Sequence, residues 1–406
     1  MKSTNSCSIK IVSIQLFLIL FIFPNLIFSQ EKSKWEKLPL DSLKTNRIET
    51  DSTKNLVLFV DKLKSLKNKT LKKDVSIIHI GDSHIQGGAF TNTVKIGLEN
   101  YFGKGGIGLV FPHKLAKTNG VSNPNFSSKN SWTSKKNTSK IGQLDSGIMG
   151  YVIQSKEANV QIDYTNKKDS CRFDRIKIFA QTAKDSLLLT TDSITSKNYQ
   201  LTDNYLDIKL EKPIDTFKME FKSVKDSITN FYGISLEDES VNGLIYNSIG
   251  VNGAKFSDYN ASPIFWKQLQ NIEADCVILS MGTNEAQGNI DLFQTDLIET
   301  VSKIKQIYPN AAIIITTPPI SYYKKIRPNS RIKTIAEIIK KVSADNEICY
   351  WDLYSVQKEI DPKVHWKYNK LLRPDLVHYS TEGYQLQAKL FLKAFKKLGF
   401  QDLEAN

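Results

Sequence analysis

The stretch Asp74-Val-Ser-Ile-Ile-His-Ile-Gly-Asp-Ser-His84 decides how the rest of the chain is interpreted. Four aliphatic residues between positions 75 and 80 predict a strand that is buried on both faces, as in a parallel sheet. Gly81 can turn the chain sharply at the carboxyl end of this strand, which is the edge where open α/β sheets bind ligands. Ser83 is therefore expected at a cleft, with the backbone donors of a following helix close by.

The segments on either side of a long central region alternate between strand and helix patterns. Residues 52–66 and 89–102 carry apolar residues at helical spacing around the opening strand. The alternation resumes at Gly243 and continues almost to the end of the chain. Strands are expected at 244–249, 276–281, 311–317 and 348–352, and helices at 257–272, 292–308, 331–346 and 381–398. Such alternation predicts a doubly wound parallel sheet with right-handed crossovers.

Residues 105–242 have a different character. No amphipathic helix pattern is present there, and short alternating or β-rich runs are separated by polar turns. Runs at this spacing are typical of a β-sandwich. The sequence therefore predicts a discontinuous α/β domain of residues 30–104 plus 243–406, interrupted by an inserted β-rich domain at 105–242.

The N-terminal 29 residues have the features of a secretory signal peptide. Lys2 and Lys10 provide the positive region, an apolar run follows from Ile11 to Phe23, and Ser29 precedes an acceptable cleavage point. We expect export to the periplasm, cell envelope or medium, with no stable membrane insertion once the segment is removed. An uncleaved anchor helix is the alternative, because the apolar run is long for a signal.

Charge and cysteine content narrow the range of partners. The formal net charge of +13 favours anionic partners such as cell-wall polymers, although lysines spread over a solvated surface would give the same number. No dense basic block or basic-aromatic module occurs, so no nucleic-acid partner is expected. Cys171, Cys276 and Cys349 do not form a disulfide framework, and no Cys/His cluster has the spacing of a metal site.

Three further segments supply groups that could act together with Ser83. Asp375-Leu-Val-His378 places a carboxylate and an imidazole three residues apart, just before a Ser380/Thr381 helix cap. Asp375 can then hold Nδ1 of His378, which leaves Nε2 free to act as the base that activates Ser83. The Ser83 N–H, the Gly253 N–H and the Asn284 amide are the candidate donors of an oxyanion hole. Each of these residues alone also has a purely structural explanation, as a turn, cap or surface residue.

Other residues near these segments are given structural roles. Asp82 is expected to bond locally and hold the turn, His84 to pack or shape the pocket, and His79 to be a satisfied core histidine. Phe111, Trp132 and Tyr151 could stack on a sugar face, but packing in the core is the commoner fate of such residues.

The four segments Gly-Asp-Ser-His (81–84), Gly-Val-Asn-Gly (250–253), Gly-Thr-Asn-Glu (282–285) and Asp-Leu-Val-His (375–378) occur in the order of the four blocks of the SGNH, or GDSL-like, hydrolases, which the chain resembles. The resemblance covers residues 75–100 and 243–400. It implies a three-layer α/β/α flavodoxin-like fold and a serine esterase that uses neither metal nor cofactor. His84 and the β-rich insert resemble the peptidoglycan O-acetylesterase branch, whose insert is similar to a carbohydrate-binding jelly roll.

The leading prediction is an exported serine esterase that removes O-acetyl groups from a polysaccharide, with peptidoglycan as one candidate substrate. An O-acetyltransferase acting on a cell-envelope glycan could use the same site, because only the acyl acceptor differs. A non-catalytic glycan-binding protein with a relic hydrolase domain is the third hypothesis. The presence of every triad and oxyanion residue argues against this third hypothesis.

Overall fold

The computed structural model describes residues 40–404, apart from 51–52, 122–124, 140–145, 167–171, 192–195 and 225. The predicted signal peptide, Cys7 and Cys171 lie outside the described residues. Cys276 and Cys349 are both buried free thiols, as expected of small core residues.

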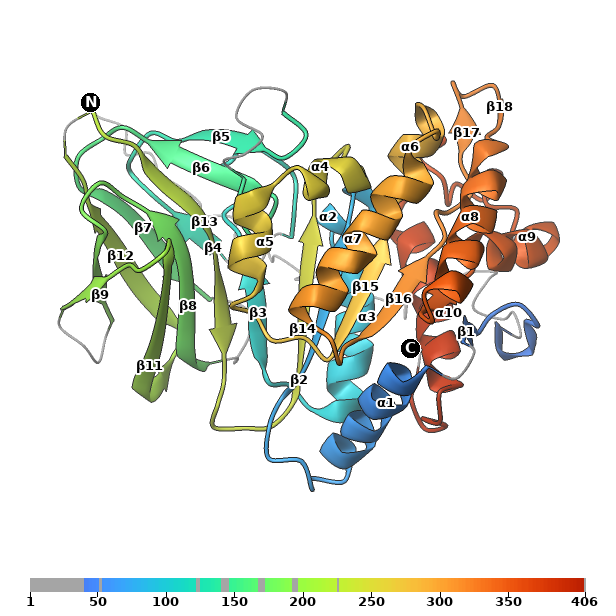
Figure 1. Cartoon of the computed structure of the whole chain (residues 1–406), viewed down its shortest axis with the longest axis horizontal. Coiled ribbons are helices and arrows are strands. Elements are labelled where there is room, and N and C mark those ends of the chain that lie inside the picture. The colour runs from blue at the N-terminus through green and yellow to red at the C-terminus, as the bar shows by residue number, and fades with distance from the viewer. Residues whose placement is uncertain are drawn as a thin grey trace, which may run out of the picture. The chain divides into compact units, whose positions relative to one another are not determined.

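A six-stranded sheet forms the centre of the α/β region (Figure 1). Its strand order is β1-β19-β16-β15-β2-β14, and all pairs are parallel except β1 with β19. The strand β2 (Val75–Gly81) lies between β15 and the edge strand β14 and is buried along its whole length, as predicted from its aliphatic run. The other strands are β1 (Ile48–Glu49), β14 (Leu244–Gly250), β15 (Cys276–Ser280), β16 (Ala312–Thr316) and β19 (Cys349–Trp351).

Helices form two groups of neighbours around this sheet. α1 (Lys54–Lys67), α3 (Ala89–Phe102) and α10 (Thr381–Lys396) pack together, and α4 (Phe256–Asn260), α7 (Phe293–Ile307) and α8 (Arg331–Asp345) form the other group. The predicted α/β/α architecture is therefore confirmed. Shorter helical segments are the 3-10 turn Leu40–Ser42, α2 (Ser83–Gln86), α5 (Pro263–Leu269), α6 (Thr283–Gln287) and α9 (Leu353–Val364).

Two details of the α/β region differ from the prediction. The single helix expected at 257–272 is two helices, because Pro263 has no N–H to continue α4 and instead opens α5. The helix α9 and the small hairpin of β17 (Tyr322–Tyr323) and β18 (Arg327–Pro328) were not predicted. Asp352 begins α9 by accepting a hydrogen bond from the Ser355 amide at 3.1 Å.

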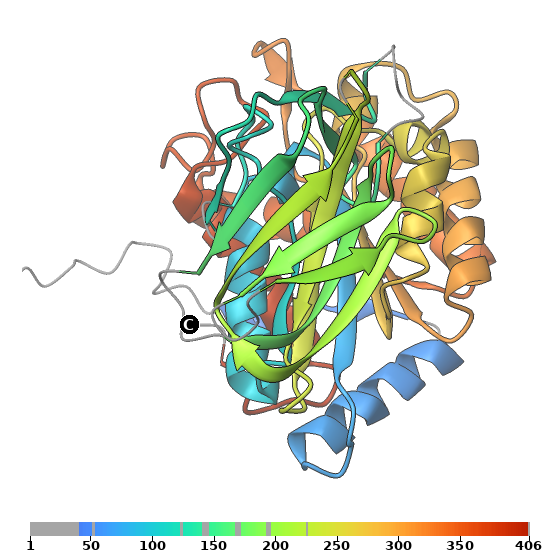
Figure 2. The ribbon, with the colours of Figure 1, turned by 90° about the vertical axis from the view of Figure 1, so that its left-hand side faces the viewer.

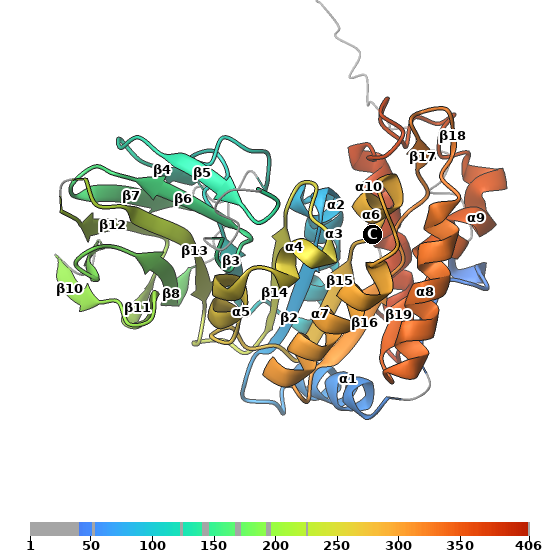
Figure 3. The ribbon, with the colours of Figure 1, turned by 45° about the horizontal axis from the view of Figure 1, so that its top comes forward.

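The stretch between Gly106 and Glu237 forms two antiparallel sheets (Figures 2 and 3). One has the order β10-β9-β12-β7-β4, and the other has the order β11-β8-β13-β6-β5 with β3 beside β13. The strands are β3 (Gly106–Val110), β4 (Asn125–Ser127), β5 (Thr133–Lys136), β6 (Tyr151–Ser155), β7 (Val160–Thr165), β8 (Phe173–Gln181), β9 (Ser186–Thr190), β10 (Lys197–Gln200), β11 (Tyr205–Ile214), β12 (Thr216–Lys222) and β13 (Thr229–Glu237).

Aromatic side chains join the two antiparallel sheets into a sandwich. Tyr164 of β7 contacts Phe173 of β8, with ring centroids 5.7 Å apart, and Phe221 of β12 contacts Phe231 of β13 at 6.1 Å. All four rings are fully buried, so they form the apolar layer between the sheets. The predicted β-sandwich interrupting the α/β sheet is confirmed. The boundaries at 104/105 and 242/243 stay our proposal.

Contacts along β3 link the sandwich to the parallel sheet. β3 pairs with β13, and its Leu109 amide donates to Oδ1 of Asn247 in β14 at 2.8 Å. Asn247 is buried, so this bond satisfies two polar groups that water does not reach. The middle of β14 is consequently held from the side of the sandwich as well as by β2.

Candidate active site

Ser83 lies at the carboxyl end of β2, as predicted. Asp82 begins α2, and its Oδ1 accepts a hydrogen bond from the His84 amide at 2.9 Å, which confirms its expected role in holding the turn. The backbone at Gly81 passes so close to β15 that a Cβ atom there would lie 2.7 Å from the Ser280 carbonyl oxygen. Ser83 is thereby fixed on a tight turn and remains partly exposed.

Ser83, His378 and Asp375 are brought into one hydrogen-bonded chain. Ser83 Oγ lies 2.8 Å from Nε2 of His378, and Nδ1 of His378 lies 3.0 Å from Oδ2 of Asp375. With its proton on Nδ1, the imidazole donates to the carboxylate and presents the Nε2 lone pair to the Ser83 hydroxyl. This is the geometry that a serine nucleophile and its base require.

The turn that carries Asp375 and His378 is fixed by local bonds. Oδ1 of Asp375 accepts hydrogen bonds from the amides of Val377 and His378, both at 2.8 Å, and Leu376 between them adopts a left-handed conformation with φ +57°. Burial on its own would raise the pKa of Asp375, but these donors outweigh it and hold the pKa below its usual value. Asp375 is therefore a carboxylate at neutral pH.

The predicted oxyanion donors differ in whether they already donate a hydrogen bond. Gly253 has φ +84°, is exposed, and has open space where a Cβ would stand. Within the described part of the chain, neither the Gly253 N–H nor the Ser83 N–H donates a hydrogen bond, so both are available to a ligand. The Asn284 Nδ2 already lies 2.9 Å from the Ala254 carbonyl and 3.3 Å from Oδ2 of Asp82. A substrate oxygen would have to compete with Asp82 for an Asn284 hydrogen.

Two buried carboxyl groups accompany these donors. Burial raises the pKa of Asp82 to about 8, and the nearby Glu285 adds to this shift. Burial also raises the pKa of Glu285 to about 7, against the hydrogen bond that it accepts from the Phe256 amide. Asp82 is therefore protonated at neutral pH, which spares the site a buried negative charge beside the expected oxyanion.

His79 and His84 have the structural roles predicted for them. His79 is buried between the Tyr246 hydroxyl and the Ser280 hydroxyl, each 2.6 Å from one ring nitrogen. His84 is buried with Nδ1 2.9 Å from the Tyr384 hydroxyl, and its ring centroid lies 5.3 Å from that of His378. Burial lowers the pKa of His84 to about 3, so a neutral ring packs beside the His378 ring.

The three aromatic residues considered as sugar-stacking platforms are buried. Phe111, Trp132 and Tyr151 expose between 3% and 6% of their surface, so the stacking alternative is wrong and core packing is correct. The rings of Phe111 and Tyr151 pack against each other, with their centroids 5.5 Å apart. The Tyr151 hydroxyl nevertheless reaches the site indirectly, because it donates to Gln86 at 3.0 Å.

Two residues that hold the Gly253 loop were not identified from the sequence. Gln86 Oε1 accepts a hydrogen bond from the Asn252 amide at 2.5 Å, and Lys136 Nζ donates to the Asn252 carbonyl at 2.8 Å. Lys136 is separated from Asn252 by 116 positions, and no local motif marks it. Only the packing of the sandwich against the α/β region reveals this contact.

A hairpin of β17 and β18 flanks the triad turn. The Tyr322 amide donates to the Leu376 carbonyl at 2.8 Å, so the hairpin is bonded to the turn between Asp375 and His378. Lys324, Lys325 and Arg327 at its tip are exposed. The hairpin that is bonded to the triad turn therefore carries exposed positive charge.

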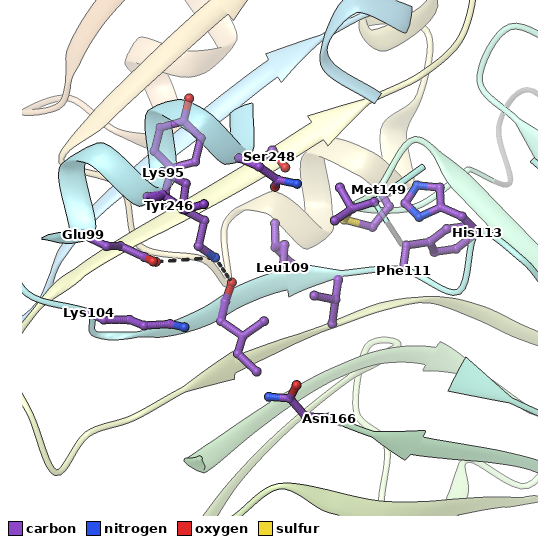
Figure 4. Close-up of a pocket in the computed structure, with 15 residues that line it drawn as sticks. Lys95, Glu99, Lys104, Leu109, Phe111, His113, Met149, Asn166, Tyr246 and Ser248 are labelled. Atoms are coloured by element: carbon purple, nitrogen blue, oxygen red, sulfur yellow. Dashed lines mark hydrogen bonds and ion pairs between the residues drawn. The ribbon is translucent and has the colours of Figure 1, made fainter. Parts of the chain in front are cut away.

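A hollow lies between α3 and β3 (Figure 4). It has a volume of about 290 Å³, and the side chains of Lys95 and Glu99 reach it from α3. Lys95 Nζ donates to the Ile107 carbonyl at 2.6 Å and lies 3.6 Å from Glu99. Because none of the triad residues lines this hollow, we do not assign it to the same chemistry.

Comparison with known proteins shows what the chain is similar to. Residues 226–386 match the family model described as the GDSL-like Lipase/Acylhydrolase family. This match confirms the predicted resemblance to the SGNH, or GDSL-like, hydrolases. Among curated proteins, no relative matches the sequence.

A solved structure described as a peptidoglycan O-acetylesterase in action shares the fold over most of the chain. It matches with a TM-score of 0.72 and 21% sequence identity, and the match covers 84% of this chain and 95% of that chain. The match therefore extends beyond the α/β region. A lipase/acylhydrolase from Enterococcus faecalis (TM-score 0.30, 23% identity, 38% of this chain and 77% of that chain) and a carbohydrate esterase family 3 protein from Talaromyces cellulolyticus (TM-score 0.30, 17% identity, 38% and 72%) also match.

Two kinds of feature are absent from the described residues. None of the helices in the described ranges is long and apolar enough to cross a membrane. Among the same residues, no group of three His, Cys, Asp or Glu side chains is arranged to hold a metal ion.

Proposed function

We propose that the protein is an exported serine esterase that hydrolyses O-acetyl esters on a polysaccharide. The observation that carries the proposal is the hydrogen-bonded chain from Ser83 Oγ through His378 to Asp375. The match to the GDSL-like hydrolases supports the same class of chemistry.

The reaction proceeds in two acyl-transfer steps. Ser83 Oγ attacks the acetyl carbon while Nε2 of His378 takes the hydroxyl proton. The tetrahedral intermediate then expels the sugar oxygen, which leaves as an alcohol with the proton from His378, and Ser83 is acetylated. Water attacks this ester with His378 again as base, and acetate leaves as Ser83 regains its proton.

Backbone donors stabilise the negative charge of each tetrahedral intermediate. The Ser83 and Gly253 amides are the principal donors in this proposal, and Asn284 contributes a side-chain hydrogen once it turns from Asp82 to the substrate. Removing one donor of this kind typically costs about 2.7–4 kcal/mol of transition-state stabilisation. Asp375 keeps its negative charge and stabilises the imidazolium that forms on His378.

A polysaccharide substrate is supported by features outside the triad. The solved structure that matches with a TM-score of 0.72 is that of a peptidoglycan O-acetylesterase. This match covers 84% of the chain, so it includes part of the sandwich. The cations of the β17–β18 hairpin beside the triad turn suit an anionic polymer, which peptidoglycan is. We further propose that residues 1–29 direct export, so that enzyme and polymer meet outside the cytoplasm.

The proposal is tested by measuring acetate release from O-acetylated peptidoglycan, xylan and pectin. The wild-type protein and Ser83→Ala are compared on each polymer and on 4-nitrophenyl acetate. We expect hydrolysis by the wild type and a loss of about 10³-fold or more in Ser83→Ala. Equal rates for the two proteins on all four substrates would overturn the proposal.

A further inference from the structure

Lys136 is the last residue of β5, and it contacts the loop that carries the predicted oxyanion donor Gly253. Its Nζ donates a hydrogen bond of 2.8 Å to the Asn252 carbonyl oxygen. The Asn252 carbonyl and the Gly253 N–H belong to the same peptide group. Lys136 therefore acts on the opposite end of the peptide group whose N–H is the predicted oxyanion donor.

The planarity of the peptide group couples its two ends. In a trans peptide the C=O and N–H point in opposite directions, so holding the oxygen in place also fixes the direction of the hydrogen. A cation at the oxygen also draws electron density away from the nitrogen, which makes the N–H a stronger donor. Gly253 has φ +84° and no side chain to restrain it, so its peptide needs such an external restraint.

The Asn252 amide, which precedes this peptide group, is held through the residue that pairs with Lys136 across the β5–β6 ladder. Lys136 in β5 is paired directly with Tyr151 in β6. The Tyr151 hydroxyl donates to Oε1 of Gln86, and this same oxygen accepts the Asn252 amide. Both sides of Asn252 are thus fixed by groups that depend on the β5–β6 pair.

The surroundings of Lys136 suit this role. Its side chain is only partly exposed, and burial lowers its pKa while Asp258 opposes the shift. A partly desolvated ammonium group interacts more strongly with a carbonyl oxygen than a fully hydrated one does. Lys135, the neighbouring residue of the same strand, points to the other face and offers a natural control.

We propose that Lys136 is a positioning residue that orients and polarises the Asn252–Gly253 peptide, so that the sandwich takes part in building the oxyanion hole. This inference rests on the proposed esterase function. If Lys136 has this role, the rate of acyl transfer depends on a side chain from the β-rich region, whereas the affinity for substrate does not.

The first test compares Lys136→Met with Lys135→Met on 4-nitrophenyl acetate. Loss of one oxyanion donor lowers kcat by about 10²–10³-fold, and a donor that is misdirected but still present should cost roughly 10-fold or more. We expect this fall in kcat for Lys136→Met with KM within about twofold of the wild type, and wild-type kinetics for Lys135→Met. An unchanged kcat in Lys136→Met, or a change confined to KM, would overturn the inference.

Chemical rescue separates positioning from a general effect on folding. Lys136→Cys is assayed before and after alkylation with 2-bromoethylamine, which converts the cysteine into a close lysine analogue. We expect kcat to recover at least several-fold after alkylation, with the identically treated wild type as the control for the other cysteines. A folded Lys136→Cys protein whose kcat does not change on alkylation would contradict the proposal.

The outcome is distinguishable from failure of the esterase proposal itself. If wild type and Ser83→Ala are equally inactive, the proposed function fails and the inference falls with it. If the wild type shows Ser83-dependent hydrolysis but Lys136→Met and its rescue show no effect on kcat, only the role of Lys136 is refuted.

Discussion

Asp375 makes three contacts with its own turn, and only one of them reaches the imidazole. Its Oδ1 binds the amides of Val377 and His378, while its Oδ2 faces Nδ1 of His378 at 3.0 Å. The carboxylate therefore both shapes the turn and selects the tautomer of the base.

Replacing Asp375 with Asn should separate these two roles. An Asn Oδ1 can still accept the two amide hydrogens, but the other position becomes an NH₂ group, which favours the wrong tautomer of His378. We expect kcat on 4-nitrophenyl acetate to fall by roughly 10²–10⁴-fold with the protein still folded. An Asp375→Asn variant with near-normal kcat would show that His378 acts without its carboxylate partner.

The protonation of Asp82 should be visible in the pH dependence of stability. Its pKa is raised to about 8 in the folded protein against an ordinary value of 3.8, so between these pH values the folded state holds a proton that the unfolded state has lost. The contribution of Asp82 to the free energy of unfolding therefore falls as the pH rises through this window, by at most about 1.4 kcal/mol per pH unit.

Urea unfolding of the wild type and Asp82→Asn between about pH 5 and pH 7.5 checks this prediction. Asn is neutral throughout, and its Oδ1 can keep the bond to the His84 amide. We expect the free energy of unfolding to fall less steeply with pH in Asp82→Asn than in the wild type. Parallel curves for the two proteins would mean that Asp82 is ionised in the folded state.

Residues that share a short segment were the ones that sequence could assign. Asp375 and His378 stand three positions apart, and the prediction that they lie together with Ser83 agrees with the structure. Lys136 and Gln86 could not be found in this way, since their contact with Asn252 depends on how the sandwich meets the sheet. The hydrogen bond from Asn284 to Asp82 could not be predicted from the sequence either, because it depends on a distance within the folded site.

The loop after β14 contains two glycines whose requirements differ. A Cβ at Gly250 would lie 2.2 Å from the backbone nitrogen of Gln86, whereas a Cβ at Gly253 would meet nothing within 4 Å. Gly250 is therefore needed for the close approach of β14 to α2. Gly253 is needed for its positive φ, which costs a residue with a side chain roughly 1–2 kcal/mol.

Alanine at these two positions should consequently give different phenotypes. We expect Gly250→Ala to be the more destabilising variant, by about 2 kcal/mol or more, because backbone atoms must move to accept the methyl group. Gly253→Ala should lose about 1–2 kcal/mol of stability. Its kcat should fall more than that of Gly250→Ala, because the strained peptide moves its N–H. Thermal unfolding and steady-state kinetics on both variants measure the comparison, and a reversed order of stability would contradict it.

Elements with a strong period were predictable, and elements defined by tertiary contacts were not. The helix at 89–102 and the buried strand at 75–81 follow their apolar patterns closely. The short strands β3, β4, β5 and β10 carry few apolar residues or have glycine in them, so their pairing partners define them. The β17–β18 hairpin has two residues in each strand, which is too short for an alternating pattern to appear.

At the scale of the whole molecule, the distribution of charge around the site predicts how a polymer is recognised. Lys324 and Lys325 lie on the hairpin that is bonded to the triad turn, at the carboxyl end of the parallel strands. Lys69 and Lys72 are equally exposed but precede β2, at the opposite end of the sheet from Ser83.

A matched pair of double variants tests this arrangement. We expect Lys324→Gln/Lys325→Gln to lower kcat/KM on an anionic acetylated polymer several-fold at low salt, with a smaller effect at high salt because charge interactions are screened. Lys69→Gln/Lys72→Gln should behave like the wild type, although it removes the same charge. Equal effects of the two double variants would show that only net charge matters.

Covalent labelling of the nucleophile is the most direct test of the central claim that Ser83 is activated by His378. The protein is treated with phenylmethylsulfonyl fluoride, and the modified residue is located by peptide mass mapping in the wild type, Ser83→Ala and His378→Ala. Our account predicts a single sulfonylated residue, Ser83, with no label in Ser83→Ala and much slower labelling in His378→Ala. Labelling of another serine, or labelling of Ser83 at the same rate without His378, would contradict it.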